Sequence, residues 1–122
     1  MVAMLTSGCP NKEDINEEVR LSIYNHSDKD IYYELSVKDP IYYSYPPVKS
    51  SFIPSKSFFS GKDAFRQVLR DGNKMYIWLF DKEVIDTTSW EEVVGKDLYL
   101  IRYDLTLKDL EEMNWTITYE GE

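Results

Sequence analysis

Apolar and polar residues alternate in several short stretches of the chain. In residues 19–25 the apolar side chains occupy every second position, and residues 31–37 repeat the alternation. A period of two is typical of strands that bury one face. The turn-forming residues 25–28 lie between the two stretches and predict that they pair as an antiparallel hairpin.

Further stretches extend the β pattern. Residues 74–80 are apolar on both faces, as expected of a central strand that is covered on both sides. In residues 115–120, Trp115, Ile117 and Tyr119 alternate with polar residues. Additional strands are predicted over 57–60 and 98–105.

Three short stretches have helical spacing and lie between predicted strands: 62–72, 88–95 and 106–114. Thr88 and Glu91 have the spacing of a capping box at the start of the second helix, and Gly95 is expected to end it. Thr106 is the expected N-cap of the third helix, and Asn114 is expected to end it in the left-handed conformation.

This succession of elements predicts a mainly β domain. The expected architecture is a β-sandwich, immunoglobulin-like or of a related Greek key topology, with short helical crossovers. The alternative is an α+β fold with helices on one sheet face. The length of 122 residues suits a single domain with one core, expected to span 18–122.

A proline- and tyrosine-rich loop, 39–54, separates the second and third predicted strands. Stiff prolines and rigid aromatic rings lower the entropy lost on binding. Tyr42, Tyr43 and Tyr45, together with Trp90, are therefore candidate ligand-binding residues for a glycan or an envelope protein. The alternative is that the loop rings fold back and cover an open end of the sandwich.

Charge limits the classes of partner. The chain has 22 acidic and 14 basic residues, which gives a net charge of −8. Such a field repels a phosphate backbone, so no nucleic-acid partner is expected. The same charge suits solubility, or alternatively a small acidic inhibitor or immunity-type protein that binds a basic partner.

The sequence offers no catalytic or cofactor-binding constellation. Cys9 is the single cysteine and His26 the single histidine, so neither an intrachain disulfide nor a zinc knuckle can form. His26, Ser27 and Asp28 are adjacent in the chain, whereas a catalytic triad converges from separate segments. The prediction is a non-enzymatic protein with no cofactor and no metal.

The N-terminal sequence MVAMLTSGCP resembles the end of a bacterial lipoprotein signal, in which small residues precede a cysteine that is lipidated after cleavage. Residues 1–8 are interpreted as a signal remnant, Cys9 as the lipidation site, and 9–17 as an acidic tether. Residues 12–14, Lys-Glu-Asp, resemble the export signal that follows the lipid cysteine in surface-exposed lipoproteins of the Bacteroidetes.

Two blocks carry a family resemblance. The run NHSDKDIY (25–32) and the block YDLTLKDLEEMNWTITY (103–119) are similar to those of small uncharacterised lipoproteins of Bacteroides and its relatives. The resemblance covers most of 18–122 and implies a cell-envelope address. Together with Cys9 it predicts a protein that is lipid-anchored in the outer membrane, either exposed at the cell surface, as residues 12–14 indicate, or facing the periplasm. It supplies no catalytic residues. The function expected in the envelope is therefore the binding of a glycan or a protein, or a structural role. Thr87, in Asp-Thr-Thr, also resembles an O-glycosylation acceptor of exported Bacteroidetes proteins.

Overall fold

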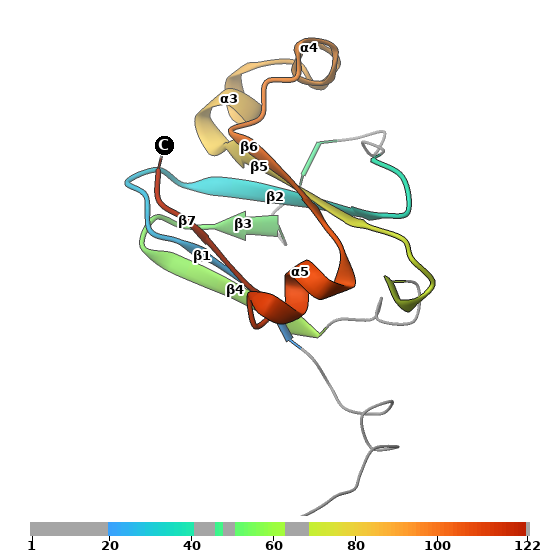
Figure 1. The fold of residues 1–122 in the computed structure, drawn as a ribbon. Helices are drawn as coiled ribbons and strands as arrows, with labels where there is room; N and C mark the ends of the chain where they lie inside the picture. The colour runs from blue at the N-terminus through green and yellow to red at the C-terminus, as the bar shows by residue number, and fades with distance from the viewer. Residues whose placement is uncertain (1–19, 41–45, 48–50, 63–68, 122) are drawn as a thin grey trace, which may run out of the picture.

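The computed structural model describes residues 20–40, 46–47, 51–62 and 69–121, and in these residues the chain is mainly β (Figure 1). The strands are β1 (Arg20–Asn25), β2 (Ile31–Val37), β3 (Phe52–Ile53), β4 (Ser57–Lys62), β5 (Met75–Asp81), β6 (Ile101–Leu105) and β7 (Thr116–Tyr119). The helices are α3 (Lys82–Thr87), α4 (Trp90–Lys96) and α5 (Leu107–Glu112). The predicted signal remnant (1–8), Cys9 and the tether (9–17) lie outside the described residues.

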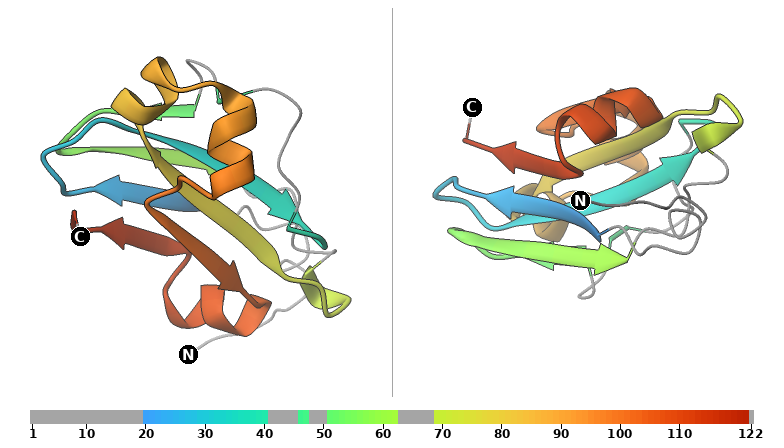
Figure 2. Two further views of the ribbon diagram at one scale, coloured as in Figure 1. Left: turned by 90° about the horizontal axis from the view of Figure 1, so that it is seen from above. Right: turned by 60° about the horizontal axis from the view of Figure 1, so that its bottom comes forward.

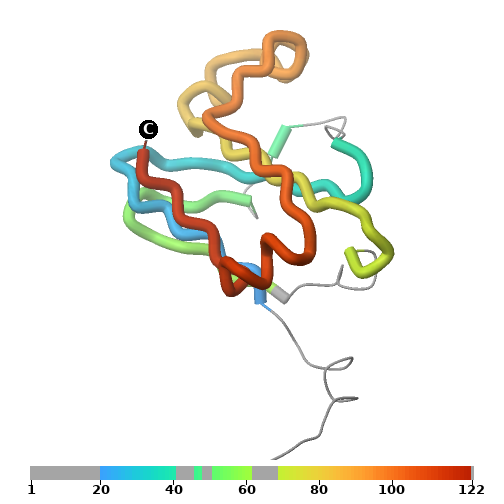
Figure 3. The backbone as a smooth tube through the Cα atoms, in the orientation of Figure 1, coloured from blue at the N-terminus to red at the C-terminus, as the bar shows by residue number. Residues whose placement is uncertain are grey.

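The strands form two sheets. One is three-stranded in the order β4-β1-β7, and the other is four-stranded in the order β3-β2-β5-β6. β1 pairs antiparallel with β4 and parallel with β7, so the first and the last described strands lie side by side (Figure 3). The four-stranded sheet is antiparallel throughout.

The predicted hairpin of β1 and β2 is wrong, because the two strands belong to different sheets. The buried side chain of Asn25 explains the change of sheet. Its Nδ2 donates to the carbonyl oxygens of Lys29 at 2.7 Å and Ile53 at 3.1 Å. Its Oδ1 accepts from the backbone N–H of Ser27 at 3.0 Å. Asn25 thereby ties the corner after β1 to β3, a segment distant in sequence.

Residues of both sheets build the main hydrophobic core. It contains buried residues from both: Leu21 and Ile23 of β1, Ile31 of β2, Ile53 of β3, Met75, Ile77 and Leu79 of β5, Leu105 of β6, and Ile117 and Tyr119 of β7. The alternation predicted for 115–120 is confirmed, since Ile117 and Tyr119 are buried and Thr118 is exposed. Residues at every second position therefore build this core.

A second cluster covers the opposite face of the four-stranded sheet. Trp78 and Phe80 of β5 pack there with Val93 of α4, and α3 and α4 lie across this face at the top of Figure 1. β5 is thus a central strand with both faces covered, as its continuous apolar sequence predicts.

Both ends of α5 lie where the sequence predicts them. α5 has a capping box, in which Thr106 Oγ1 accepts from the N–H of Asp109 and the Asp109 carboxylate accepts from the N–H of Thr106. These hydrogen bonds lower the pKa of Asp109. Asn114 follows with φ 55°, as predicted.

α4 begins and ends later than the sequence predicts. Its N-cap is Ser89, whose Oγ accepts from the N–H of Glu92 at 3.2 Å, and the predicted cap Thr88 lies one residue outside. The helix runs past Gly95 to Lys96, and Asp97 caps it in the left-handed conformation at φ 53°.

The two remaining helical segments are α3 and the predicted helix 62–72. α3 is absent from the sequence prediction and begins directly after β5, with Asp81 as its N-cap. The predicted helix 62–72 lies mostly outside the described residues. At its end, Gly72 has φ 95° and donates its N–H to Leu69 O at 3.0 Å, as a helix stop should.

Candidate functional site

Of the site residues predicted from the sequence, the structure describes Thr87 and Trp90. Tyr42, Tyr43 and Tyr45 lie outside the described residues, as does Cys9. Thr87 is exposed at the end of α3, where its hydroxyl donates to Glu83 O at 2.7 Å. Its glycosylation stays a prediction.

Trp90 opens α4 and is half-buried rather than freely exposed. Its ring meets the buried Phe80 ring edge-on, with centroids 5.6 Å apart and an interplanar angle of 66°. This contact helps to fasten α4 to the four-stranded sheet. A role of Trp90 in binding stays a prediction.

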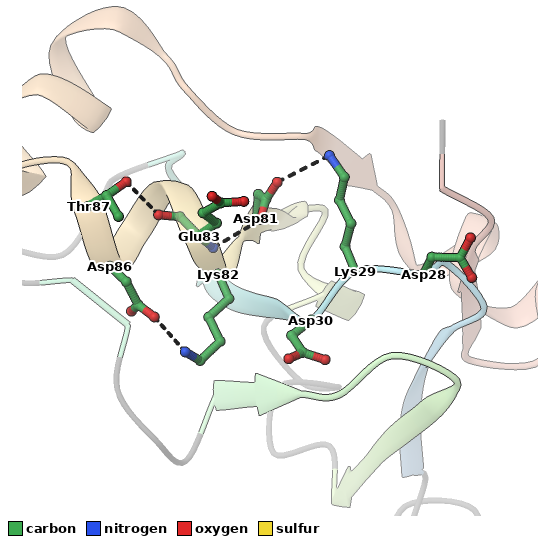
Figure 4. Close-up of a pocket in the computed structure, with 8 residues that line it drawn as sticks. All are labelled: Asp28, Lys29, Asp30, Asp81, Lys82, Glu83, Asp86 and Thr87. Carbon is green, nitrogen blue, oxygen red and sulfur yellow. Dashed lines mark hydrogen bonds and ion pairs between the residues drawn. The ribbon is translucent and has the colours of Figure 1, made fainter.

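A polar hollow of about 450 Å³ lies between the corner that follows β1 and helix α3 (Figure 4). Its lining residues are all polar: Asp28, Lys29, Asp30, Asp81, Lys82, Glu83, Asp86 and Thr87. Within the described part of the chain, no group of three or more His, Cys, Asp or Glu side chains is placed to hold a metal ion.

Neighbouring groups already pair many charges in this polar hollow. Lys29 Nζ lies 3.2 Å from Asp81 Oδ2, and this hydrogen bond raises the pKa of Lys29. Asp81 Oδ1 also accepts from the N–H of Glu83 at 2.9 Å, while Lys82 pairs with Asp86. These side chains cap α3 and tie it to the corner, so we assign them to the fold.

A different surface lies on the outer face of the three-stranded sheet. Tyr24 of β1 and Phe58 of β4 are directly opposite in register, and their rings stack at 5.2 Å with an interplanar angle of 27°. His26 meets Tyr24 edge-on at 6.0 Å. We call Tyr24, Phe58 and His26 the aromatic platform. Figure 2, right, shows β7, β1 and β4 side by side with no helix across them.

Phe58 is the unusual member of the platform. Among the described residues it is the large apolar side chain that is exposed, at 56% of its surface. Its neighbour Phe59 points to the opposite face and packs on Tyr33 in the core, with ring centroids 4.8 Å apart. Because successive strand residues alternate between faces, a Phe-Phe pair in β4 must present one ring outward.

Hydroxyl groups surround the platform. By strand alternation, Ser22, Ser60, Thr116 and Thr118 share its face, and Thr118 is beside Tyr24 in register. Ser22 and Ser60 are hydrogen-bonded through their hydroxyls at 3.3 Å. Arg20 Nε donates to Ser60 Oγ at 3.1 Å. The surface therefore combines flat apolar rings with hydrogen-bonding groups at their margin.

Glu34 of β2 is a buried carboxyl group, although the sequence pattern predicts that it faces solvent. It occupies an alternate position that reads as solvent-facing, yet its side chain is 8% exposed and it is opposite Trp78 in register. Among the described residues, none makes a hydrogen bond to its Oε2. Burial away from water raises the pKa of Glu34 to about 7.

Asp104 does not cap α5, although it lies only two residues before the cap residue Thr106. Its carboxylate instead accepts two hydrogen bonds from Arg102, at 2.7 and 2.8 Å, which lower the pKa of Asp104. The Arg102 guanidinium also lies over the Tyr76 ring, 5.5 Å from its centroid. The pair thus orders side chains along β6, an edge strand.

Comparison with family models, with curated proteins and with solved structures gives no match to this chain. A bilayer-spanning helix needs about 20 mainly apolar residues. Of the helices that the structure describes, none has the length and apolar character to cross a membrane.

Proposed function

We propose that this chain is a non-enzymatic, glycan-binding domain of a lipid-anchored cell-envelope protein. The observation that carries the proposal is the Tyr24–Phe58 ring stack, which is exposed on an open sheet face. Exposed aromatic groups on a rigid scaffold commonly mark recognition surfaces, because large rings lose little entropy when they contact a ligand.

The chemistry of the aromatic platform suits a sugar. One face of a pyranose ring presents C–H groups that can lie flat on an aromatic ring, while its hydroxyls point to the margin. Here Ser60 and Thr118 flank the two rings with hydroxyls, and Arg20 supplies guanidinium donors. The net charge of −8 disfavours an anionic ligand, so we assign the platform to neutral glycans.

The proposed architecture is a β-sandwich of immunoglobulin-like or related Greek key type. Support comes from the core, which takes side chains from both sheets, for example Ile23 of β1 and Ile77 of β5. The α+β alternative also places helices on one sheet face, as α3 and α4 are placed on the four-stranded sheet. In the sandwich, the open face of the three-stranded sheet is the free binding surface.

The proposed address is the outer membrane, with the chain anchored through lipidated Cys9 and exposed at the cell surface. Its support is the sequence pattern around Cys9 and the resemblance of 25–32 and 103–119 to Bacteroides lipoproteins. In a Bacteroides host, expression from the gene with its upstream in-frame sequence should give a triacyl-sized mass increment. Cys9→Ala should abolish the increment, and protease should shave the unmutated protein from intact cells. An unmodified, protease-shielded protein would overturn this address.

Glycan binding is tested with the full chain on an array of neutral and charged glycans. We expect binding to neutral glycans that persists when the salt concentration is raised, since stacking and neutral hydrogen bonds are weakly screened. Phe58→Ala should weaken binding at least about tenfold. Phe58→Trp keeps a ring at the position and serves as the matched control, which should still bind.

The array also separates the competing functions. A wild-type chain that binds no glycan, or a Phe58→Ala variant that binds as well as wild type, would overturn the proposal. Binding to a basic protein that collapses in salt would instead identify the acidic inhibitor expected as the alternative.

A further inference from the structure

A smaller hollow adjoins the aromatic platform. Its volume is about 270 Å³, and its lining includes His26, Ser27, Asp28, Lys56, Glu120 and Gly121. His26 belongs to both features, because its ring also meets Tyr24 at 6.0 Å. Tyr24 in turn stacks on Phe58, so the three rings lead from the exposed sheet face to the edge of the hollow.

The polar groups of this small hollow keep unused hydrogen-bonding capacity. The Glu120 carboxylate lies 3.7 Å from His26 Nδ1, which is beyond hydrogen-bond distance. Lys56 Nζ donates to His26 O at 2.9 Å and lies 3.3 Å from Asp28 Oδ1, whereas an ammonium carries three donors. Both the carboxylate and the ammonium are largely exposed, so a ligand can reach them.

The backbone beneath the small hollow is firmly held. Ser27 is buried, and its Oγ donates to Asn25 Oδ1 at 2.6 Å. Gly121 has φ 96°, and a Cβ at that position would lie 2.9 Å from Ser27 Cβ. The floor therefore does not need to rearrange when a ligand enters, which reduces the entropy lost on binding.

We propose that this small hollow is a second sugar subsite, so that the ligand is a neutral oligosaccharide rather than a single sugar. The inference rests on the proposed function and deepens it. One sugar unit lies on the Tyr24–Phe58 stack, and the neighbouring unit enters the hollow past His26. Glu120 accepts from adjacent hydroxyls of that unit, and Lys56 donates to its oxygens.

The charges support a neutral oligosaccharide. Asp28 and Glu120 place negative charge in the small hollow, and Lys29 and Lys56 place positive charge there. Neither a phosphate nor a cationic group therefore finds a field of one sign. The volume lies near the lower limit for ligand pockets, about 300 Å³, which suits one sugar-sized group rather than a longer segment.

The test uses ladders of gluco-, manno-, xylo- and N-acetylglucosamine oligosaccharides, from monosaccharide to hexasaccharide, in titration calorimetry with the full chain. Affinity for the preferred ladder should rise about tenfold or more from monosaccharide to disaccharide or trisaccharide. Glu120→Gln keeps the shape of the side chain and should remove most of that gain while leaving monosaccharide binding unchanged. Lys56→Met should act in the same direction.

Two controls make the outcomes distinguishable. Glu112→Gln changes an exposed glutamate of α5 outside both features and should bind like wild type. Phe58→Ala should weaken every rung of the ladder. Affinity that is independent of chain length, or a Glu120→Gln variant that keeps the full gain, would overturn the second subsite and leave the platform intact. Failure of all ladders to bind the unmutated chain would overturn both.

Discussion

The outer faces of the two sheets carry aromatic side chains of similar chemistry in opposite environments. On the four-stranded sheet, Trp78 and Phe80 are 1% and 0% exposed, because α3 and α4 cover them. On the three-stranded sheet, Phe58 is 56% exposed. The aromatic residues of the first face are explained by packing. Packing does not explain the exposed ring on the second face, whereas the proposed glycan binding would.

The cover on one side comes from the connection between two adjacent strands. β5 and β6 are neighbours, yet the chain between them forms α3 and α4 before it returns. This connection folds over the outer face of its own sheet, where Val93 supplies the buried contact of α4. Among the described residues, no connection does the same for β4, β1 and β7 (Figure 2).

The largest effect expected from this comparison is on the covered face. Phe80→Ala should lower the free energy of unfolding by about 3–5 kcal/mol, because it removes a fully buried ring and leaves a cavity. Urea denaturation monitored by tryptophan fluorescence measures the change. Phe58→Ala is the matched substitution on the open face. Equal losses for the two variants would mean that Phe58 is a core residue.

A second effect concerns the buried carboxyl group on the covered face. The pKa of Glu34 is raised to about 7 in the folded chain, from a usual value of 4.5. The protonated form is therefore favoured by folding, and its stabilisation is complete below about pH 4.5 and is lost as the pH rises through about 7. We expect the unfolding free energy to fall by about 3 kcal/mol across that window.

Glu34→Gln isolates this contribution, because the amide has a similar shape and does not titrate. The variant should lose the decline between about pH 4.5 and pH 7. Asp104 and Asp109 do not confuse the measurement. Their pKa values are lowered, so their contributions are present above the usual value of 3.8 and are lost only in more acidic solution. Parallel pH profiles for wild type and Glu34→Gln would contradict the assignment.

The smallest stability effect is expected on the open face. Phe58→Ala removes one cross-strand aromatic pair with Tyr24, so the unfolding free energy should fall by about 0.5–1 kcal/mol. Glycan affinity should nevertheless fall at least about tenfold. Thermal unfolding and calorimetric binding on the same samples separate the two effects. A large loss of stability with unchanged affinity would reverse the account of this face.

Periodicity predicts much of the fold but not which strands pair. β2, β5 and β7 follow from their alternating or continuous apolar sequences. The sheet partners of β1 do not, because the hydrogen bonds of Asn25 to Ile53 join segments that no local pattern connects. A hairpin was the natural local prediction for 25–28, and a distant contact overrides it.

The sequence pattern alone also does not determine where each helix begins. Thr88 with Glu91 and Ser89 with Glu92 have the same capping-box spacing, so the sequence alone allows either start for α4. α3 escaped prediction because its apolar residues, Val84 and Ile85, are adjacent and do not recur at helical spacing.

The candidate site was only partly readable from the sequence. The proline- and tyrosine-rich loop predicts Tyr42, Tyr43 and Tyr45 as binding residues, whereas two of the three residues of the proposed platform lie on regular strands. A usable signal was present in the Phe58–Phe59 pair, because a strand must turn one of the two rings outward. What the sequence could not tell is that no described helix covers that ring. Glu34 was hidden for the opposite reason, since its apparently exposed position is buried in the fold.

The most direct test of the aromatic platform is an NMR titration of the full chain with the best-binding neutral oligosaccharide, following aromatic ring and backbone amide signals. The account predicts saturable shifts at Tyr24, Phe58 and His26, with the ring signals of Trp78 and Trp90 unchanged. Shifts centred on Trp90 and α4, with Phe58 unaffected, would contradict it and move the binding site to the face that the helices cover.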